Sequence, residues 1–200
     1  MKKIILLMIV ILLNVSVIYA KETLELKNID DNEFEYFEIK IENSIGKDKK
    51  DDLSSIINND QSFDLFINNV KKFRLIPVSF VSRKARNRVC ILSYFSDNNE
   101  FVDNLNIGYI SREEDEITGS CQGINAVSVE SINDKKFLLY IISNRVANHY
   151  ENYTTVVTIN SRDIQLDEEL SSCINNNKID SIAKARKAIK KCYHDKRIKN

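Results

Sequence analysis

Residues 136–144, KFLLYIISN, form the stretch that decides the fold. Apolar side chains occupy both of its alternating faces, so a strand here is covered on both sides and belongs at the centre of a sheet. The neighbouring segments are short, rich in β-branched residues and bounded by polar turns, which predicts an antiparallel meander. The six predicted strands are 74–82, 88–95, 105–110, 125–132, 136–144 and 153–160. Pro77 lacks the N–H that a strand ladder needs, so we expect the first of these strands at an edge.

The segments before these strands give mixed signals. Residues 33–43, EFEYFEIKIEN, alternate in a way that predicts a strand. Leu53, Ile56 and Ile57 follow helical spacing, and Ser62 can cap a helix that runs to about residue 72.

The C-terminal segment is predicted to be helical. Asp167 can cap a short helix that Asn175–Asn177 end, and Asp180 or Ser181 can cap a second one. An apolar stripe then runs along the last helix, at Ile182, Ala185, Ile189 and Tyr193. The sequence therefore predicts the α+β class, an antiparallel β-meander of about six strands with helices before and after it.

Residues 1–20, MKKIILLMIVILLNVSVIYA, have the layout of a secretory signal peptide. Two lysines precede an unbroken apolar run from Ile4 to Leu13, and Ala20 is a small residue at the expected cleavage point. An uncleaved membrane anchor is the alternative, but a bilayer span needs about 20 mostly apolar residues. We expect removal of residues 1–20, leaving residues 21–200 as a single periplasmic or secreted domain.

Export predicts that the four cysteines form disulfides, because disulfides persist in oxidising compartments. Four cysteines allow three pairings, and the preferred one is Cys90–Cys121 with Cys173–Cys192, which closes the shorter loops. In a tight helical hairpin Cys173 would lie opposite the start of the last helix, so the second pair requires splayed helices or a non-helical Cys173. No C-x-x-C spacing supports the alternative of a zinc site.

Charge is segregated along the chain. Residues 71–90 carry seven basic and no acidic side chains, and residues 181–200 carry eight basic and one acidic. Residues 21–70 carry six basic and thirteen acidic side chains, and residues 91–180 carry six and fifteen. The simplest interpretation is that basic elements pack beside acidic ones and neutralise them.

No catalytic constellation stands out. Residues 119–123, GSCQG, have a nucleophile-elbow spacing, but the acidic run before them is a poor buried strand, and an oxidised cysteine is no nucleophile. His149 and His194 are the two histidines, and they form no zinc motif. We therefore expect no catalytic residues, no metal and no cofactor.

Two loops have the composition of binding surfaces. Residues 83–88 are basic, and residues 145–153 combine arginine, histidine and tyrosine, which are common at the energetic centres of interfaces. If the strands run up and down, these loops and the acidic loop 111–124 lie at one end. The predicted partner-binding residues are Arg83, Lys84, Arg86, Arg88, Arg145, His149, Tyr150 and Tyr153.

The composition favours a protein partner, because export and an acidic remainder argue against nucleic acid. By analogy with other small exported domains, we expect an inhibitor or immunity-type protein that occludes an envelope-targeting toxin or hydrolase. Two alternatives remain open: a secreted hydrolase with a site near His149, or an envelope ligand-binding or structural module. No stable membrane insertion is expected after cleavage.

Overall fold

The computed structural model describes residues 22–45, 53–82, 88–108, 120–146, 149–176, 179 and 181–199. The predicted signal peptide, residues 1–20, lies outside the described residues. Within these ranges, ten strands form two antiparallel sheets, and helices precede and follow them, which confirms the α+β class. The strands of the predicted meander are divided between the two sheets.

The first sheet has the order β1–β3–β4–β5–β6, with β2 paired to β4, and the second has the order β10–β9–β8–β7. The strands of the first sheet are β1 (Leu24–Asn28), β2 (Leu53–Ile57), β3 (Phe63–Ile67), β4 (Val70–Ser82), β5 (Arg88–Ser96) and β6 (Phe101–Asn106). The strands of the second sheet are β7 (Ser120–Ile132), β8 (Lys135–Val146), β9 (His149–Ile159) and β10 (Ile164–Leu166).

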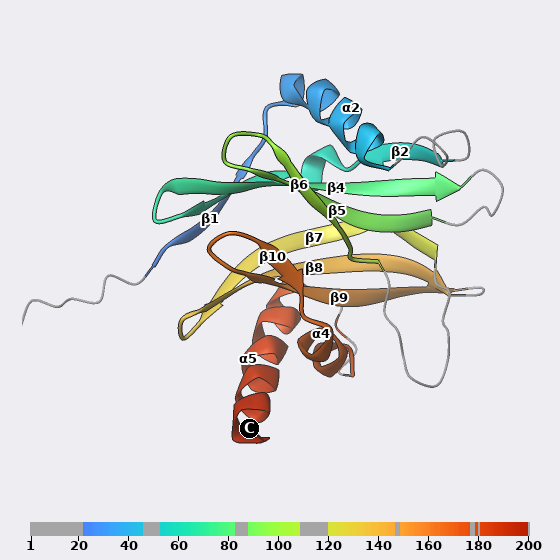
Figure 1. Ribbon diagram of the computed structural model, residues 1–200. Coiled ribbons are helices and arrows are strands. Elements are labelled where there is room, and N and C mark those ends of the chain that lie inside the picture. Colours follow the sequence, from blue (N-terminus) through green and yellow to red (C-terminus); the bar gives the residue numbers. More distant parts are fainter. Residues whose placement is uncertain are drawn as a thin grey trace, which may run out of the picture.

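The two sheets stack face to face, and helices cover their outer faces (Figure 1). Helix α2 (Phe34–Ser44), preceded by the short η1 (Asp31–Glu33), covers the first sheet, whereas α4 (Glu168–Asn175) and α5 (Ile182–Lys199) cover the second. A second short 3-10 turn, η2 (Asn59–Gln61), links β2 to β3. The apolar residues accordingly form three buried clusters, one between the sheets and one under each set of helices.

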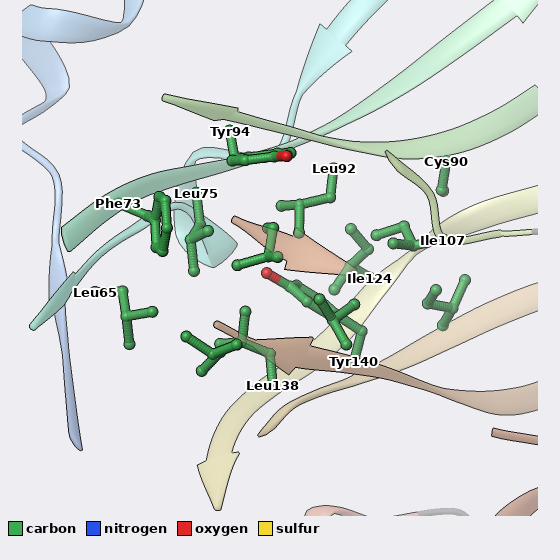
Figure 2. Packing of buried hydrophobic residues seen from close by; sticks show 14 of the residues in the cluster. Leu65, Phe73, Leu75, Cys90, Leu92, Tyr94, Ile107, Ile124, Leu138 and Tyr140 are labelled. Carbon is green, nitrogen blue, oxygen red and sulfur yellow. The ribbon is translucent and has the colours of Figure 1, made fainter. Parts of the chain in front are cut away.

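Strand β8 is central to the second sheet, which confirms the prediction from its two apolar faces. Leu138, Tyr140 and Ile142 point between the sheets, where Figure 2 shows Tyr140 among side chains of both. Phe137 and Leu139 point the other way, under the C-terminal helices. This double burial is the physical reason for the continuous apolar run.

The prediction of a strand at residues 33–43 is wrong, because Phe34–Ser44 is helix α2. Its sequence supports two periods, and the helical one places Phe34, Phe37 and Ile41 on a single buried face. These three side chains cover apolar residues on the outer face of the first sheet. Tertiary burial, which the sequence pattern does not show, therefore decides the conformation.

A buried arginine fixes α2 to that sheet. Arg74 on β4 donates from Nε and Nη2 to the two carboxylate oxygens of Asp64 on β3, at 2.7 and 2.9 Å. Its Nη1 donates to Glu33, just before α2, and its guanidinium lies 4.7 Å from the ring centre of Phe37. The planar guanidinium thus joins both layers by charge-assisted bonds.

The predicted helix from Ser62 to about residue 72 is also wrong, because this segment is the β3–β4 hairpin, and Leu53–Ile57 is strand β2. Asn68 and Asn69 have φ of 52° and 63°, and this left-handed pair turns the chain tightly between antiparallel strands. Asparagine tolerates that conformation better than other side chains. The asparagine pair was therefore the feature of the sequence that indicated a hairpin, whereas the apolar spacing around it wrongly favoured a helix.

The predicted edge position of the strand with Pro77 is wrong as well. Strand β4 pairs with β5 along one side and, on the other side, with β3 over residues 70–75 and β2 over residues 78–82. Pro77 falls in the gap between β3 and β2, where its carbonyl accepts from the N–H of Asn58 at 3.0 Å. The N–H and the carbonyl of one strand residue point to the same edge of the strand. The position where Pro77 lacks an N–H therefore also faces the gap between β3 and β2, and neither strand pairing loses a hydrogen bond there.

The C-terminal helices follow the predicted bounds and capping. The Asp167 carboxylate accepts from the N–H of Leu170 at 3.0 Å, and Ala185 and Ile189 are buried on the predicted stripe of α5. Cys173 and Cys192 form a disulfide with a Cα–Cα distance of 6.0 Å. Because Cys192 lies about 15 Å along α5 from its start, α4 crosses the middle of α5, and the two form no tight hairpin.

The hydroxyl of Tyr140 gives a test of the core. It is fully buried, burial raises its pKa, and it has no hydrogen-bond partner among the residues that the structure describes. Tyr140→Phe removes an unsatisfied polar group without changing the packing, so we expect it to stabilise the fold by about 1 kcal/mol in urea unfolding. Tyr94→Phe is the control, because the Tyr94 hydroxyl bonds the backbone of Ile164, and its loss should destabilise by about 1 kcal/mol. A destabilising Tyr140→Phe would contradict the assignment.

Candidate functional site

Five of the eight predicted partner-binding residues lie in described segments, and these five fall at one end of the sandwich. Arg88 begins β5, Arg145 lies near the end of β8, and His149, Tyr150 and Tyr153 lie at the start of β9. The other three, Arg83, Lys84 and Arg86, lie outside the described residues. Residues 145–153 are mostly strand, since β8 extends to residue 146 and β9 begins at 149, whereas the sequence predicted a loop.

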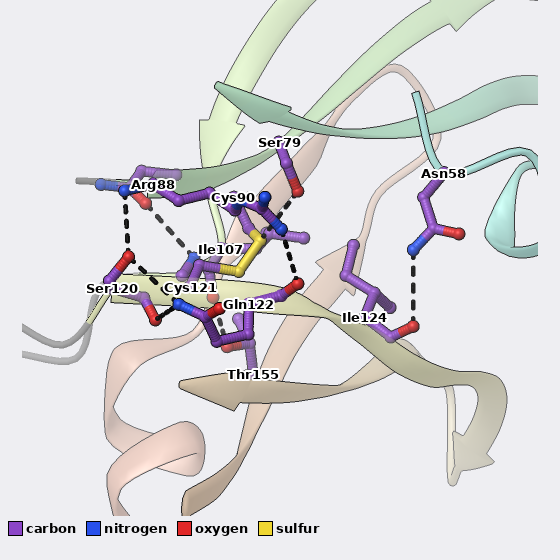
Figure 3. The surroundings of a disulfide bond; sticks show 12 residues. Asn58, Ser79, Arg88, Cys90, Ile107, Ser120, Cys121, Gln122, Ile124 and Thr155 are labelled. Carbon is purple, nitrogen blue, oxygen red and sulfur yellow. Dashed lines mark hydrogen bonds between the residues drawn. A yellow bond between two sulfur atoms is a disulfide. The ribbon is translucent and has the colours of Figure 1, made fainter. Parts of the chain in front are cut away.

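Hydrogen bonds tie the two sheets together at this end (Figure 3). The backbone N–H of Arg88 donates to Ser120 Oγ and its guanidinium donates to the carbonyl of Gln122, both at 3.0 Å. Ser120 is paired with Arg145 across the β7–β8 ladder, and Arg145 is paired with Tyr150 across the β8–β9 ladder. The described ends of the predicted loops therefore meet, and we call the set Arg88, Ser120, Arg145, His149 and Tyr150 the hairpin end.

A disulfide joins the two sheets beside the hairpin end. Cys90 on β5 and Cys121 on β7 are bonded with a Cα–Cα distance of 5.7 Å, which confirms the predicted pairing. The N–H groups of Ile107 and Gly108 donate to the carbonyl of Cys90 at 3.1 and 3.0 Å. Thr155 on β9 donates to the carbonyl of Ile107 at 2.7 Å (Figure 3). Segments from both sheets are thus fixed around one cross-link.

The outer side of the hairpin end presents an arginine and a tyrosine. Arg145 and Tyr150 are direct cross-strand partners, and both are exposed, Tyr150 at 67%. Strand pairing fixes the backbone of Tyr150, while its aromatic ring stays open to solvent. Tyrosine and arginine supply large contact area and hydrogen bonds at interfaces.

The inner side carries a hydrogen-bonded set of three side chains. His149 Nε2 lies 2.8 Å from Glu151 Oε1, and the Tyr153 hydroxyl donates to Glu151 Oε2 at 2.6 Å. Tyr153 is only 7% exposed, so it supports the carboxylate from within the fold. The side chain of His149 is 59% exposed. These three residues are spaced by two along β9, which places them on one face of the strand. The spacing is visible in the sequence, but the composition of the segment predicted a loop.

The chemistry open to the hairpin end follows from the groups that the described residues place there. The His149 ring is hydrogen-bonded to Glu151, and all four cysteines are in disulfides, so no thiol lies beside it as a nucleophile. Within the described ranges, no three metal-ligating side chains are placed to hold an ion. Sequence reasoning did not single out Ser120, Gln122 or Glu151, because their roles depend on contacts between strands far apart in the chain.

No protein-family model, curated protein or solved structure matches this chain. The fold and the site define an α+β domain with two stacked antiparallel sheets and two disulfides, which favours an oxidising, extracytoplasmic compartment. Of the helices that the structure describes, none has the length and apolar character to cross a membrane.

Gly108 tests how closely the cross-link is packed. A Cβ on Gly108 would lie 3.1 Å from the backbone nitrogen of Cys90 and 3.3 Å from the Cβ of Cys121, so Gly108→Ala should destabilise by about 1–3 kcal/mol in urea unfolding. A Cβ on Gly123 would meet nothing within 4 Å, so Gly123→Ala is the matched control and should cost nothing. Equal effects of the two substitutions would show that the cross-link is loosely packed.

Proposed function

We propose that this protein is a periplasmic protein-binding domain of the inhibitor or immunity type, which occludes a toxin or hydrolase that acts on the cell envelope. The observation that carries the proposal is the cross-strand pair Arg145–Tyr150, with Tyr150 67% exposed. Such a pair offers an aromatic and a cationic anchor for a protein surface.

Preorganisation of the hairpin end supports this function. Arg145 and Tyr150 lie on paired strands, and Ser120, the ladder partner of Arg145, is hydrogen-bonded to the strand that carries Cys90. A surface that is already ordered loses little conformational entropy when a partner binds, and this saving increases affinity. A domain that acts by occlusion needs that property.

Charge supports association with a partner that carries acidic groups. Arg83, Lys84 and Arg86 belong to the connection between β4 and β5, which leads to the hairpin end. These three residues lie outside the described residues, so their contact with a partner is part of the proposal. Positive side chains of this kind would speed the encounter with an oppositely charged protein.

The proposed compartment rests on two observations of different kinds. The two disulfides favour an oxidising environment, and residues 1–20 have the layout of a signal peptide. Periplasmic location therefore stays part of the proposal.

A secreted hydrolase is the second candidate, favoured by the contact between His149 and Glu151. A carboxylate at 2.8 Å orients an imidazole, which is one requirement of general acid–base catalysis. Turnover of labelled cell-wall fragments by the purified protein, abolished in His149→Ala, would favour this candidate over occlusion.

In-cell photocrosslinking tests the binding proposal. A photoreactive phenylalanine analogue replaces Tyr150 in one variant and Tyr36 in a control, since Tyr36 is 51% exposed on α2, on the opposite side of the sandwich. We expect a single protein adduct from position 150 and none of that mass from position 36. The crosslinked partner, once purified, should be inhibited by the native domain.

Binding to that purified partner then measures the two anchors. Arg145→Ala and Tyr150→Ala should each weaken binding by about tenfold or more in calorimetric titration. Their melting temperatures should stay within about 2 °C of the native protein, because neither side chain is buried. Unchanged affinity, or large losses of thermal stability, would contradict the proposal.

A further inference from the structure

Helix α5 is attached to the second sheet by one face only. Ala185, Ile189 and Cys192 are buried against the sheet and α4, and the rings of Phe137 and Tyr193 meet edge to face at 5.7 Å. The Cys173–Cys192 disulfide fixes the helix further. The opposite face of α5 is therefore held in a defined direction, toward solvent.

That outward face is basic. Its exposed cations are Lys184, Arg186, Lys187, Lys190 and Lys191. At 100° per residue, residue 187 lies on the side of the helix opposite the centre of the buried stripe. Residues 184 and 191 lie next to residue 187 on that same side. The five cations therefore lie along one side of a single helix.

The fold neutralises only part of this charge. Arg186 donates to Ser128 Oγ at 2.9 Å, and Arg186 and Lys190 share the carboxylate of Glu130, at 3.6 and 3.0 Å. Further along the helix, Lys196 contacts two carboxylates, those of Asp167 and Glu169. Lys187 and Lys191 are exposed and form no ion pair with another described residue. Carboxylates of the fold thus neutralise Arg186, Lys190 and Lys196, as the sequence predicts for basic elements, whereas Lys187 and Lys191 present their charge to solvent.

The acidic helix lies on the other side of the molecule. Glu35, Glu38 and Glu42 are exposed on α2, which covers the outer face of the first sheet (Figure 1). Two sheets separate this helix from α5, so the opposite charges cannot pair within one molecule. The exposed carboxylates of α2 and the exposed cations of α5 therefore lie on opposite sides of the domain, so an anionic surface attracts one helix and repels the other.

We propose that the outward face of α5 docks the protein onto the surface of an anionic phospholipid bilayer, independently of the hairpin end. Lysines beside such a surface each contribute favourable electrostatic energy, and several on one side of a helix reach a flat surface together. A nucleic-acid groove would add exposed aromatic rings among the cations, whereas Tyr193 of α5 is packed against Phe137. Figure 1 shows that α5 is on the outside of the second sheet, with its C-terminal end pointing away from the sandwich.

Vesicle sedimentation tests this proposal with protein recovered from the export compartment of the producing cell. The vesicles are phosphatidylglycerol with phosphatidylcholine in one arm and phosphatidylcholine alone in the other. We expect binding to the anionic vesicles at about 20 mM salt and its loss at about 500 mM, because salt screens exposed charges. Equal binding to the neutral vesicles, or no binding to the anionic ones, overturns the proposal.

Charge-reversal variants locate the surface. Lys187→Glu with Lys191→Glu should weaken anionic-vesicle binding by at least about tenfold. Lys27→Glu with Lys40→Glu has the same change in formal charge on β1 and α2, and its binding should stay within about twofold of native. Circular dichroism checks that both variants are folded. Equal losses in the two variants would mean that net charge alone acts, and tighter binding to duplex DNA than to vesicles would assign the face to nucleic acid; either result overturns the proposal.

Discussion

The Cys90–Cys121 disulfide is the constraint on which the hairpin end depends. It joins β5 of one sheet to β7 of the other across 31 residues of sequence. Both half-cystines are buried, and the carbonyl of Cys90 also holds the residues that follow β6. Stacked sheets can slide, because apolar contacts between them have little directional preference. The covalent bond and the hydrogen bonds around it remove that freedom where Arg145 and Tyr150 are exposed.

Charge has a different role in each layer of the sandwich. Between the first sheet and α2 it is buried and paired, since Arg74 is held by Asp64 and Glu33. At the surface of α5 it is exposed and only partly compensated, by Glu130, Asp167 and Glu169. Buried pairs fix geometry because an unpaired charge there is costly, whereas exposed charges mainly influence what the surface attracts. The formal neutrality of the chain conceals this division.

Sequence patterns predicted the strands best where burial on both faces left one interpretation, as in β8. They failed at residues 33–43, where strand and helix periods both fit, and at the β3–β4 hairpin, where Asn68 and Asn69 carried the signal. Composition located the hairpin end but could not pair Arg145 with Tyr150, because that pairing depends on the β8–β9 register. It also could not show that the Arg88 guanidinium is bonded to Gln122, from a distant strand.

The sequence by itself determined the α+β class, the central position of β8, the C-terminal helices and the preferred disulfide pairing. These follow from local periodicity, capping and loop length, which act over short distances along the chain. The division into two sheets, the helix at 34–44, the interior position of Pro77 and the opposite placement of the acidic and basic helices were decided only by the tertiary structure. Each depends on which apolar faces cover one another, and that is settled when distant segments pack together.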